Sequence, residues 1–358
     1  MPLTAALVGA GRIAREHVLG LLSCPVARLV GVCDRSAALA RYTAGLAGGV
    51  ATFTDHREML SALEPRVVHV LTPAATHVAI ASDCLRAGAH VIVEKPIAPT
   101  CAEFETLWAL SGQCGRHLIE DHNYLFNEPV LTLQRLVADG VLGEVREVEV
   151  RLALAISQDG GALADPNVPH PSQRMPLGAL HEFITHLAYL GLHFAAPNGA
   201  AGGPEFDSVH ATVGRRGPCA MLICDDLDAV AMIGGVRVRL RFDAVTQPDG
   251  FSVTVRGSAG SATVELFNPA VQMDIARRGP AQLRSLINQH RNGRALKRAA
   301  RRNFFRKLRN RTPYEGLHSF IRRTYAALAA GHELPVTYPE MRRTLRLIEA
   351  IAGAAGRP

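Results

Sequence analysis

The first 122 residues alternate between short apolar runs, typical of buried strands, and longer segments with helical periodicity. Repeated strand–helix units joined by short loops favour a doubly wound parallel sheet, because each right-handed crossover places a helix on one face of the sheet. The pattern therefore predicts an α/β fold for this part of the chain. Strands are expected at residues 3–9, 28–34, around 50, 67–71, 90–94 and 117–120.

A glycine-containing turn directly follows the first expected strand and opens the first expected helix. It reads Gly9-x-Gly11-x-x-Ala14, with Arg12 and Ile13 inside it. In a dinucleotide-binding Rossmann fold, the first glycine permits the tight turn, and the second lets the backbone approach a pyrophosphate at the helix N-terminus. We therefore predict a Rossmann domain whose cofactor lies against Gly9, Gly11, Arg12 and Ile13.

The residues that close the second expected strand indicate which cofactor is bound. Asp34 can accept hydrogen bonds from both ribose hydroxyls, and its charge repels a 2′-phosphate, so NAD is favoured. The adjacent Arg35 could pair with that phosphate, which keeps NADP as the alternative.

The length of the chain predicts two domains. At 358 residues it exceeds the size at which a single hydrophobic core stops growing. We expect a dinucleotide-binding domain at residues 1–121 and an α+β domain for substrate binding and oligomerisation at residues 122–358. The N-terminus does not resemble a signal peptide, and no apolar run reaches the roughly 18 residues of a membrane span, so a cytoplasmic protein is expected.

The seven cysteines are scattered without the spacing of metal ligands. They form no CxxC pair, and no nearby histidine completes a zinc-binding set, so no metal site is expected. Most are predicted to be small, buried apolar residues.

Alternating strand patterns dominate beyond residue 122 and predict an open, mainly antiparallel sheet. A proline-rich loop at residues 165–174 is interpreted either as part of the substrate pocket or as a surface connector. A last helix is expected from residue 338 to 354, with an apolar face for packing. The expected strands are 145–156, 208–213, 220–224, 229–242, 251–256 and 262–267.

Several motifs in this order resemble the Gfo/Idh/MocA family, named after glucose–fructose oxidoreductase, inositol dehydrogenase and rhizopine catabolism. They are Thr72-Pro73, His77 at a helix start, the run 87–91 reading AGAHV, Glu94-Lys95-Pro96, the segment 122–126 reading HNYLF, and the turn 142–145 reading LGEV. The chain departs from the family pattern at Ala74, where the family commonly has Asn.

This resemblance implies roles for several residues. It places Lys95 beside the nicotinamide, at the carboxyl end of a strand, where its ammonium could stabilise a developing alkoxide. Pro96 permits a cis peptide bond before it. The cofactor-binding residues that the resemblance implies are Thr72, Pro73, His77, Glu94, Lys95 and Asn123.

A second group of catalytic candidates lies on a helix near residue 182. The family has Asp and then His four residues later, and this chain has Glu182 and His186. Residues four apart share a helical face, so both side chains can point into one cleft. Histidine has an intrinsic pKa suited to accepting a hydroxyl proton, and Glu182 could orient it or contact a substrate hydroxyl. His181 falls where the family has an apolar residue and is interpreted as structural.

One intensely basic segment needs its own explanation. Residues 277–311 contain 13 Lys and Arg and no Asp or Glu, while the rest of the chain holds 26 basic against 32 acidic residues. Residues 283–311 are predicted to form a partly amphipathic helix, with Leu296, Ala299, Ala300, Phe304 and Leu308 on one stripe. The interpretations are a solvated face, a contact with anionic substrate groups, and a contact with an anionic membrane. No recognised nucleic-acid-binding motif accompanies the segment, so nucleic acid is not the expected partner.

These features predict an NAD(P)-dependent oxidoreductase acting on a secondary alcohol of a sugar, cyclitol or nucleotide sugar, with Lys95, His186 and Glu182 as catalytic residues. Two alternatives remain: an NAD-using glycosidase or epimerase of the same fold, and a non-catalytic, cofactor-sensing scaffold at an anionic surface. The resemblance also implies a homo-oligomer formed through the open sheet.

Overall fold

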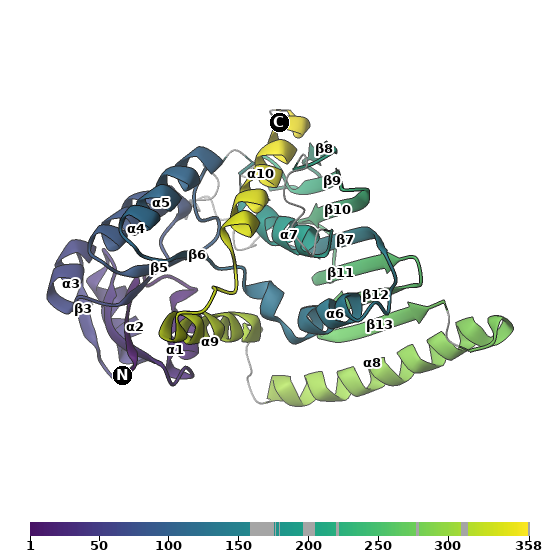
Figure 1. Cartoon of the computed structure of the whole chain (residues 1–358), viewed down its shortest axis with the longest axis horizontal. Helices are drawn as coiled ribbons and strands as arrows, with labels where there is room; N and C mark the ends of the chain where they lie inside the picture. The colour runs from purple at the N-terminus through teal and green to yellow at the C-terminus, as the bar shows by residue number, and fades with distance from the viewer. Residues whose placement is uncertain are drawn as a thin grey trace. The chain divides into compact units, whose positions relative to one another are not determined.

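The computed structural model describes residues 1–157, 175, 177–178, 180–195, 205–219, 222–276, 279–308 and 314–356 (Figure 1). The chain divides into two compact units. The first comprises Met1–Phe126 and Tyr314–Leu345, and the second Asn127–Pro313 and Arg346–Pro358. The expected boundary near residue 121 lies close to the observed one. The later segment Tyr314–Leu345, however, returns to the first unit instead of staying with the rest of 122–358.

The first unit contains a parallel sheet of strand order β3-β2-β1-β4-β5-β6, as the α/β pattern predicts. This is the Rossmann order, which changes direction between β1 and β4. The strands are β1 Leu3–Val8, β2 Ala27–Cys33, β3 Ala51–Phe53, β4 Val67–Val70, β5 His90–Val93 and β6 Leu118–Glu120. The helices are α1 Ala14–Leu22, α2 Ala37–Gly45, α3 His56–Leu63, α4 His77–Arg86, α5 Cys101–Gln113 and α9 Glu315–Ala330, with short 3-10 turns η1 Ala74–Thr76 and η2 Asn123–Phe126.

The central strands of this sheet are buried on both faces. All four residues of β4 and three of the four in β5 are buried. This explains why these strands read as continuous apolar runs instead of alternating ones. Six of the seven cysteines are buried and all are free, which confirms their interpretation as small core residues.

Helix α9, which the sequence pattern did not predict, packs on α1. A Cβ atom at Gly20 of α1 would lie 2.5 Å from Cδ1 of Ile321 of α9, so a side chain here would require this methyl group to move. Phe320, also on α9, contacts Phe126 with ring centroids 5.6 Å apart. The chain thus crosses into the second unit and returns to complete the core of the first.

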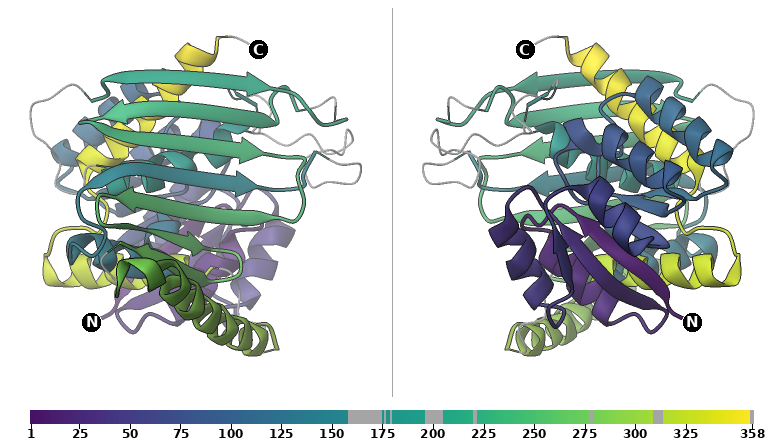
Figure 2. Two further views of the ribbon diagram at one scale, coloured as in Figure 1. Left: turned by 90° about the vertical axis from the view of Figure 1, so that its right-hand side faces the viewer. Right: turned by 90° about the vertical axis from the view of Figure 1, so that its left-hand side faces the viewer.

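The second unit contains a sheet of order β13-β12-β11-β7-β10-β9-β8. Helix α7 packs on β7 and β10, while the opposite face of β8, β9, β10 and β7 carries no helix (Figure 2, left). The strands are β7 Val145–Ala153, β8 Ser208–Gly214, β9 Asp226–Ile233, β10 Val236–Asp243, β11 Gly250–Gly257, β12 Gly260–Glu265 and β13 Ala270–Ile275. The helices are α6 Glu128–Ala138, α7 Leu180–Ala195, α8 Arg284–Leu308 and α10 Tyr338–Ala355, the last of which begins in the first unit.

Two expectations about this sheet were wrong. The single strand expected at 229–242 is two strands, because Gly234 and Gly235 have positive φ angles and turn the chain between β9 and β10. The described residues of the strand expected at 220–224 do not form a strand. The sheet is mainly antiparallel, as expected, and only β10 and β7 pair in parallel among its described strands.

The remaining expectations concern the last helix, the proline-rich loop and membrane-spanning segments. The helix expected at 338–354 is α10, and its Leu345, Leu347, Ile348 and Ile351 are buried as predicted. The proline-rich loop at 165–174 lies outside the described residues. Among the described helices, none is both long and apolar enough to cross a membrane.

Candidate active site

The glycine turn after β1 has two glycines with different tasks. Gly9 has a φ of +104°, and a Cβ there would lie 2.7 Å from the carbonyl carbon of Leu71, so the backbone itself requires glycine. A Cβ at Gly11 would meet no atom within 4 Å. The space beside Gly11 is therefore open at the N-terminus of α1, as a bound pyrophosphate requires. Arg12 is exposed and Ile13 half-buried, both at the start of α1.

Asp34, which follows β2, lies beside this turn. Its Oδ2 accepts a hydrogen bond from Ala10 N at 2.8 Å, and its Oδ1 accepts one from Ser36 N at 2.8 Å. Each carboxylate oxygen has a second lone pair, so both can still accept a ribose hydroxyl. Arg35 is exposed. The open space at Gly11 and the fixed carboxylate of Asp34 together fit an adenosine dinucleotide.

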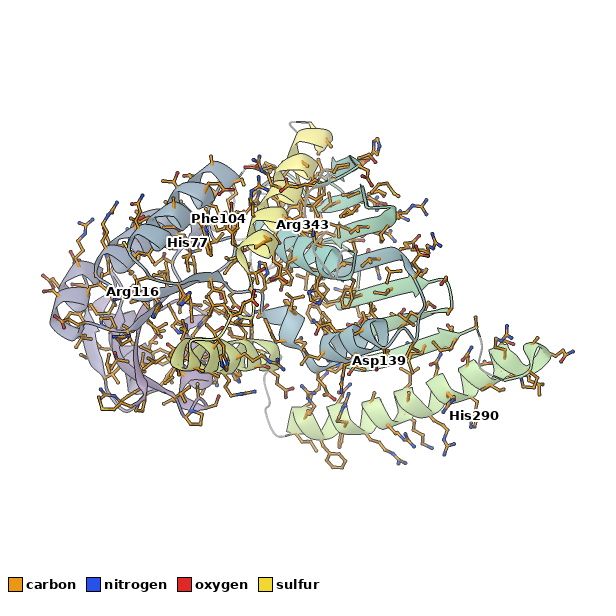
Figure 3. The ribbon with its side chains drawn as sticks, viewed as in Figure 1. His77, Phe104, Arg116, Asp139, His290 and Arg343 are labelled. Carbon is orange, nitrogen blue, oxygen red and sulfur yellow. The ribbon has the colours of Figure 1, made fainter. Side chains whose placement is uncertain are left out.

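His77 joins two loops at the same edge of the sheet (Figure 3). Its Nε2 lies 2.6 Å from the carbonyl oxygen of Thr72, and its Nδ1 lies 2.8 Å from that of Pro96. Burial lowers the pKa of His77, although these two carbonyl contacts favour its protonated form. Both ring nitrogens are occupied, so His77 holds the loops after β4 and β5 together. Pro73 is exposed in the first of these loops.

Glu94 and Lys95 follow β5 at this edge. The peptide bond between Lys95 and Pro96 is cis, as the sequence permits. Oε2 of Glu94 accepts a hydrogen bond from the backbone N of Lys95 at 3.1 Å. The next turn is held by buried Glu120, whose Oε1 accepts from Ile97 N at 2.8 Å. Lys95 is therefore presented by a firmly fixed turn at the carboxyl end of the sheet.

A chain of buried hydrogen bonds supports Glu94 from below. Nε2 of His17 lies 3.2 Å from Oε1 of Glu94, and the Nδ1 atoms of His17 and His69 lie 2.9 Å apart. Nε2 of His69 lies 3.0 Å from Oη of Tyr325. Burial lowers the pKa of His69 and raises that of Tyr325, so both are neutral. One assignment then satisfies every atom: Tyr325 donates to His69, His69 to His17, and His17 to the Glu94 carboxylate.

Asp121 lies next to Glu94 and is also buried. Burial and the charge of Glu94 raise the pKa of Asp121 well above its usual range. Burial opposes ionisation of Glu94 too, but His17 and Lys95 outweigh it and lower the pKa of Glu94. An ionised Asp121 would leave both of its oxygens without a hydrogen bond, whereas a protonated one can donate to Glu94. The pair therefore shares one proton.

The same atoms have the spacing of a metal site. Ligand atoms of His17, Glu94 and Asp121 lie within 4.8 Å of one another. Hydrogen bonds already engage these ligand atoms, because His17 donates to Glu94 and Glu94 shares a proton with Asp121. Asn123, which the resemblance places in the cofactor site, is buried at the start of η2, just after β6.

The second group of candidates lies on α7 in the other unit. Glu182 is half-buried in the first turn, and His186 is buried one turn later. Nδ1 of His186 lies 2.9 Å from Oη of Tyr189, which fixes the orientation of the ring. His181 is 4% exposed, neither of its nitrogens has a hydrogen-bond partner among the described residues, and burial lowers its pKa to about 4. This environment suits a structural histidine better than a proton acceptor.

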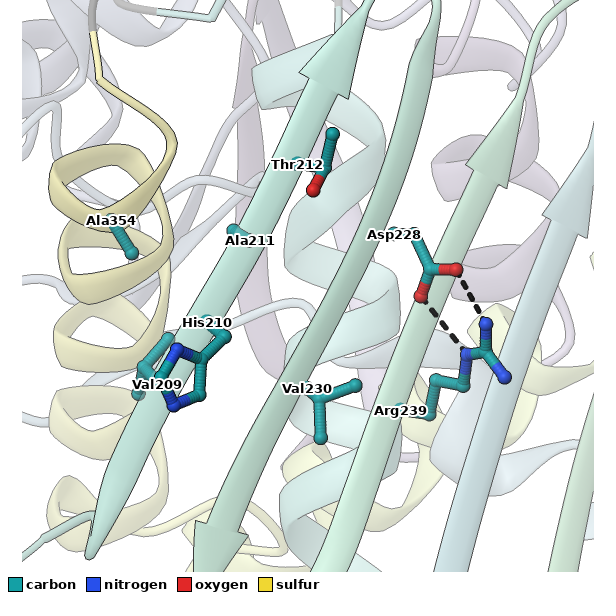
Figure 4. A pocket seen from close by; sticks show the side chains of 8 residues that line it. All are labelled: Val209, His210, Ala211, Thr212, Asp228, Val230, Arg239 and Ala354. Atoms are coloured by element: carbon teal, nitrogen blue, oxygen red, sulfur yellow. Dashed lines mark hydrogen bonds and ion pairs between the residues drawn. The ribbon is translucent and has the colours of Figure 1, made fainter.

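A hollow of about 650 Å³ lies on the open face of the second sheet (Figure 4). Its lining includes His210, Thr212 and an ion pair between Asp228 and Arg239. It contains none of the predicted catalytic or cofactor-binding residues, so we do not place the reaction there.

A family model described as an oxidoreductase family with an NAD-binding Rossmann fold, Gfo/Idh/MocA, matches residues 3–122. The similarity to the Gfo/Idh/MocA family model therefore covers residues 3–122. The matched segment, residues 3–122, contains all the predicted cofactor-binding residues except Asn123, and Lys95 is among those it contains.

Curated relatives resemble the chain over part of their length. A D-glucoside 3-dehydrogenase of Escherichia coli (strain K12) is 32% identical over 145 residues, which are 40% of this chain and 41% of that protein. A dTDP-3,4-didehydro-2,6-dideoxy-alpha-D-glucose 3-reductase of Streptomyces antibioticus is 30% identical over 199 residues, 55% of this chain and 58% of that protein. The chain therefore matches about half the length of these relatives.

Solved structures share the fold beyond the Gfo/Idh/MocA segment. The WlbA dehydrogenase from Bordetella pertussis, in complex with NADH and UDP-GlcNAcA, has a TM-score of 0.77 at 19% identity, with 99% of this chain and 95% of that chain covered. A levoglucosan dehydrogenase in complex with NADH and levoglucosan has a TM-score of 0.78 at 17% identity, with 99% and 97% covered. At these identities the likeness concerns the fold alone.

Sequence reasoning missed several residues around the site. Tyr189 could have been found from its position three residues after His186 on the same helical face. His17, His69 and Tyr325 gave no such signal, because they lie 52 and 256 residues apart along the chain. Asp121 looks like an ordinary acid after a strand until its burial beside Glu94 is known.

Proposed function

We propose that this protein is an NAD(P)-dependent dehydrogenase that oxidises, or in reverse forms, a secondary alcohol of a sugar, cyclitol or nucleotide sugar. The observation that carries the proposal is the position of Lys95. It follows β5 at the sheet edge that also holds the Gly11 turn and Asp34, and the Glu94 carboxylate accepts a hydrogen bond from its backbone N. The names of the relatives, a glucoside 3-dehydrogenase and a dTDP-sugar 3-reductase, support a sugar-like substrate.

NAD is the favoured cofactor. Its adenosine ribose would contact the Asp34 carboxylate, and its pyrophosphate would lie against Gly11 and the N-terminus of α1. A 2′-phosphate would be repelled by Asp34, and the adjacent, exposed Arg35 could offset that charge. When bound, the nicotinamide supplies the acceptor for the carbon-bound hydrogen and its electron pair.

The chain's own residues would bind the alcohol and move its proton. The Lys95 ammonium donates a hydrogen bond to the hydroxyl oxygen and stabilises the negative charge that develops there. His186 takes the hydroxyl proton at Nε2, which requires that its Nδ1–H donate to Tyr189 Oη. Glu182, one turn earlier on α7, would bind a second substrate hydroxyl or strengthen His186 as a base. The carbinol becomes a ketone as its C–H and O–H bonds break.

The open face of the sheet in the second unit is where we propose that a second copy of the chain binds. The open face of its sheet carries both charge signs, including Glu147, Glu149, Arg239 and Arg256, many of them paired across strands. A face of mixed sign can meet a second copy of itself without repulsion. The proposal therefore includes a homo-oligomer formed through this face. It also includes the cytoplasmic location expected from the sequence.

The test compares two identical substitutions on one helix. His186→Gln should lower kcat with NAD and a responsive sugar by about 10²–10⁴-fold, because a general base of this kind contributes that much. His181→Gln, on the same helix, should change kcat by only a few-fold. The measurement is the absorbance of reduced nicotinamide during turnover of a panel of glycosides, cyclitols and nucleotide sugars.

Three results would count against the proposal. Equal losses in both variants would mean that His186 acts through folding alone. Full activity of a Lys95→Met variant would remove the residue on which the proposal rests. Turnover of a sugar without net formation of reduced cofactor would instead favour an NAD-using glycosidase or epimerase.

A further inference from the structure

Helix α8 combines exposed apolar side chains with a high positive charge. Half of the large hydrophobic residues that are exposed in the described part of the chain lie at 283–308, with Leu286, Phe304, Phe305 and Leu308 each 59–65% exposed. The helix itself carries nine Lys and Arg and no Asp or Glu. We propose that α8 is a docking surface for the anionic face of a phospholipid bilayer.

Three asparagines fix which face of α8 points outward. Oδ1 of Asn292 accepts a hydrogen bond from Met273 N at 2.9 Å, Nδ2 of Asn288 donates to the Ile275 carbonyl at 3.2 Å, and Nδ2 of Asn303 donates to the Pro269 carbonyl at 3.1 Å. These bonds satisfy backbone groups of β13 and the turn before it, at the edge of the sheet. The helix is thus anchored along one side.

The outward side carries the proposed contact residues. Their spacing places them on one face of the helix, because residues three or four positions apart are neighbours on its surface. This face includes Leu286, His290, Lys297, Arg301, Phe304 and Leu308, all of them exposed. His290 is labelled on α8 in Figure 3. The residues of the apolar stripe expected from the sequence therefore lie on different sides of the helix. Ala299 is buried on the anchored side, whereas Phe304 and Leu308 are exposed.

The cations of α8 differ in whether a carboxylate of the described residues pairs with them. Arg302 pairs with Glu128 at 3.0 Å. In contrast, no described acidic residue forms an ion pair with Arg294, Lys297 or Arg301, and all three are exposed. The side chains that should meet lipid headgroups are therefore not committed to partners within the fold.

A bilayer surface matches both properties of this face at once. Basic residues are attracted to anionic headgroups, and Phe and Leu side chains enter the boundary between headgroups and acyl chains. A second copy of α8 would be repelled by the like charges. A small anionic substrate requires enclosure, which a convex helix face does not give. Nucleic acid would satisfy the cations, but the exposed aliphatic residues Leu286 and Leu308 have no partner in that contact.

The experiment measures binding of the full chain to vesicles by sedimentation. One set of vesicles contains phosphatidylcholine alone, and the other contains phosphatidylcholine with phosphatidylserine. Two variants alter the outward face: Arg294→Glu, Lys297→Glu, Arg301→Glu as a triple change, and Phe304→Ser, Leu308→Ser as a double change. The control is Arg41→Glu, Arg66→Glu, Arg215→Glu, which makes the same charge change at exposed arginines outside α8.

We expect the wild type and the control to bind the phosphatidylserine vesicles and not the neutral ones. The triple variant should bind at least tenfold more weakly, and the double variant several-fold more weakly. A Phe304→Trp variant should show a blue-shifted tryptophan emission that brominated lipids quench, since its ring would lie below the headgroups. Circular dichroism and the NAD-induced thermal shift establish that each variant is folded.

Several results would overturn the proposal. The first is no binding of the wild type to phosphatidylserine vesicles. The second is an equal loss in the α8 triple variant and the control, which would indicate net charge alone. The third is full binding by the Phe304→Ser, Leu308→Ser variant, which would exclude entry into the bilayer. The fourth is displacement of vesicles by single-stranded RNA at a lower concentration than the lipid, which would assign α8 to nucleic acid.

Discussion

Two glycines two residues apart in the cofactor turn are required for different reasons. Gly9 is needed by the fold, because its positive φ and its contact with Leu71 leave no room for a side chain. Gly11 has space around it, and that space fits a ligand instead of the protein. The same sequence motif thus contains one glycine that the fold requires and one that we propose for cofactor binding.

Alanine at each position should separate these roles. Gly9→Ala should lower the free energy of unfolding by about 3 kcal/mol, because it adds backbone strain and a steric clash. Gly11→Ala should leave the free energy of unfolding of the cofactor-free protein within about 0.5 kcal/mol of the wild type. It should nevertheless abolish the thermal shift caused by NAD. Denaturant titration and thermal shift with NAD and NADP are the measurements.

The wild type provides the reference for this pair. NAD at about 100 times its dissociation constant should stabilise it by roughly 2.7 kcal/mol, and NADP should shift it less because Asp34 repels the 2′-phosphate. An undiminished NAD shift in Gly11→Ala would show that the cofactor does not approach this glycine.

Four elements of the first unit are joined by the hydrogen-bonded chain beneath Lys95. Tyr325 belongs to α9, His69 to β4, His17 to α1, and Glu94 follows β5. Each member is buried and depends on the next for its hydrogen bond. The late helix α9 therefore contributes to the position of a turn more than 200 residues earlier in the chain.

Removing the end of this chain should be costly. Tyr325→Phe keeps the ring but leaves Nε2 of His69 buried without a donor, which should lower the free energy of unfolding by about 1–3 kcal/mol. Tyr42→Phe provides the control, because Tyr42 is 66% exposed and should change stability negligibly. Urea denaturation of both variants measures the difference. Equal stabilities would mean that water replaces the lost hydroxyl.

At the scale of the whole molecule, buried neutral histidines control the response to acid. Burial lowers the pKa values of five histidines across both units: His69, His77, His90, His181 and His318. In the unfolded chain these groups bind protons near their ordinary pKa of 6.5, whereas in the folded protein they do not. Their contribution to stability is therefore present above pH 6.5 and is lost as the pH falls toward the folded values.

Three acids act in the opposite direction. The pKa values of Asp121, Asp226 and Glu265 are raised, mainly by burial, so their contribution is lost as the pH rises above their ordinary values. Fewer groups take part in this effect. Between about pH 4 and 6.5 the histidines should prevail.

We therefore expect the free energy of unfolding to rise with pH from 4 to 6.5, as measured by urea denaturation at several pH values. His181→Gln isolates one group. Since the pKa of His181 falls from 6.5 to about 4, the rise should be smaller in this variant by on the order of 3 kcal/mol. An unchanged rise would show that His181 is accessible to protons in the folded protein.

The sequence by itself determined the Rossmann half of this protein and much of its candidate site. Strand–helix alternation, the Gly9–Gly11 turn and Asp34 are local patterns, and a parallel sheet brings the ends of its strands to one edge whatever else the chain does. Glu94, Lys95 and His77 could therefore be placed near the cofactor turn from their positions relative to the strands. Helix α8 was likewise predictable from periodicity.

Only the tertiary structure decided the features that depend on distant contacts. The parallel pairing of β7 with β10, the return of α9 to the first unit and the chain from Tyr325 to Glu94 join residues far apart in the sequence. The outward orientation of Phe304 and Leu308 was also decided there. Periodicity shows which residues share a helical face, but the asparagine contacts with the sheet edge select the face that is buried.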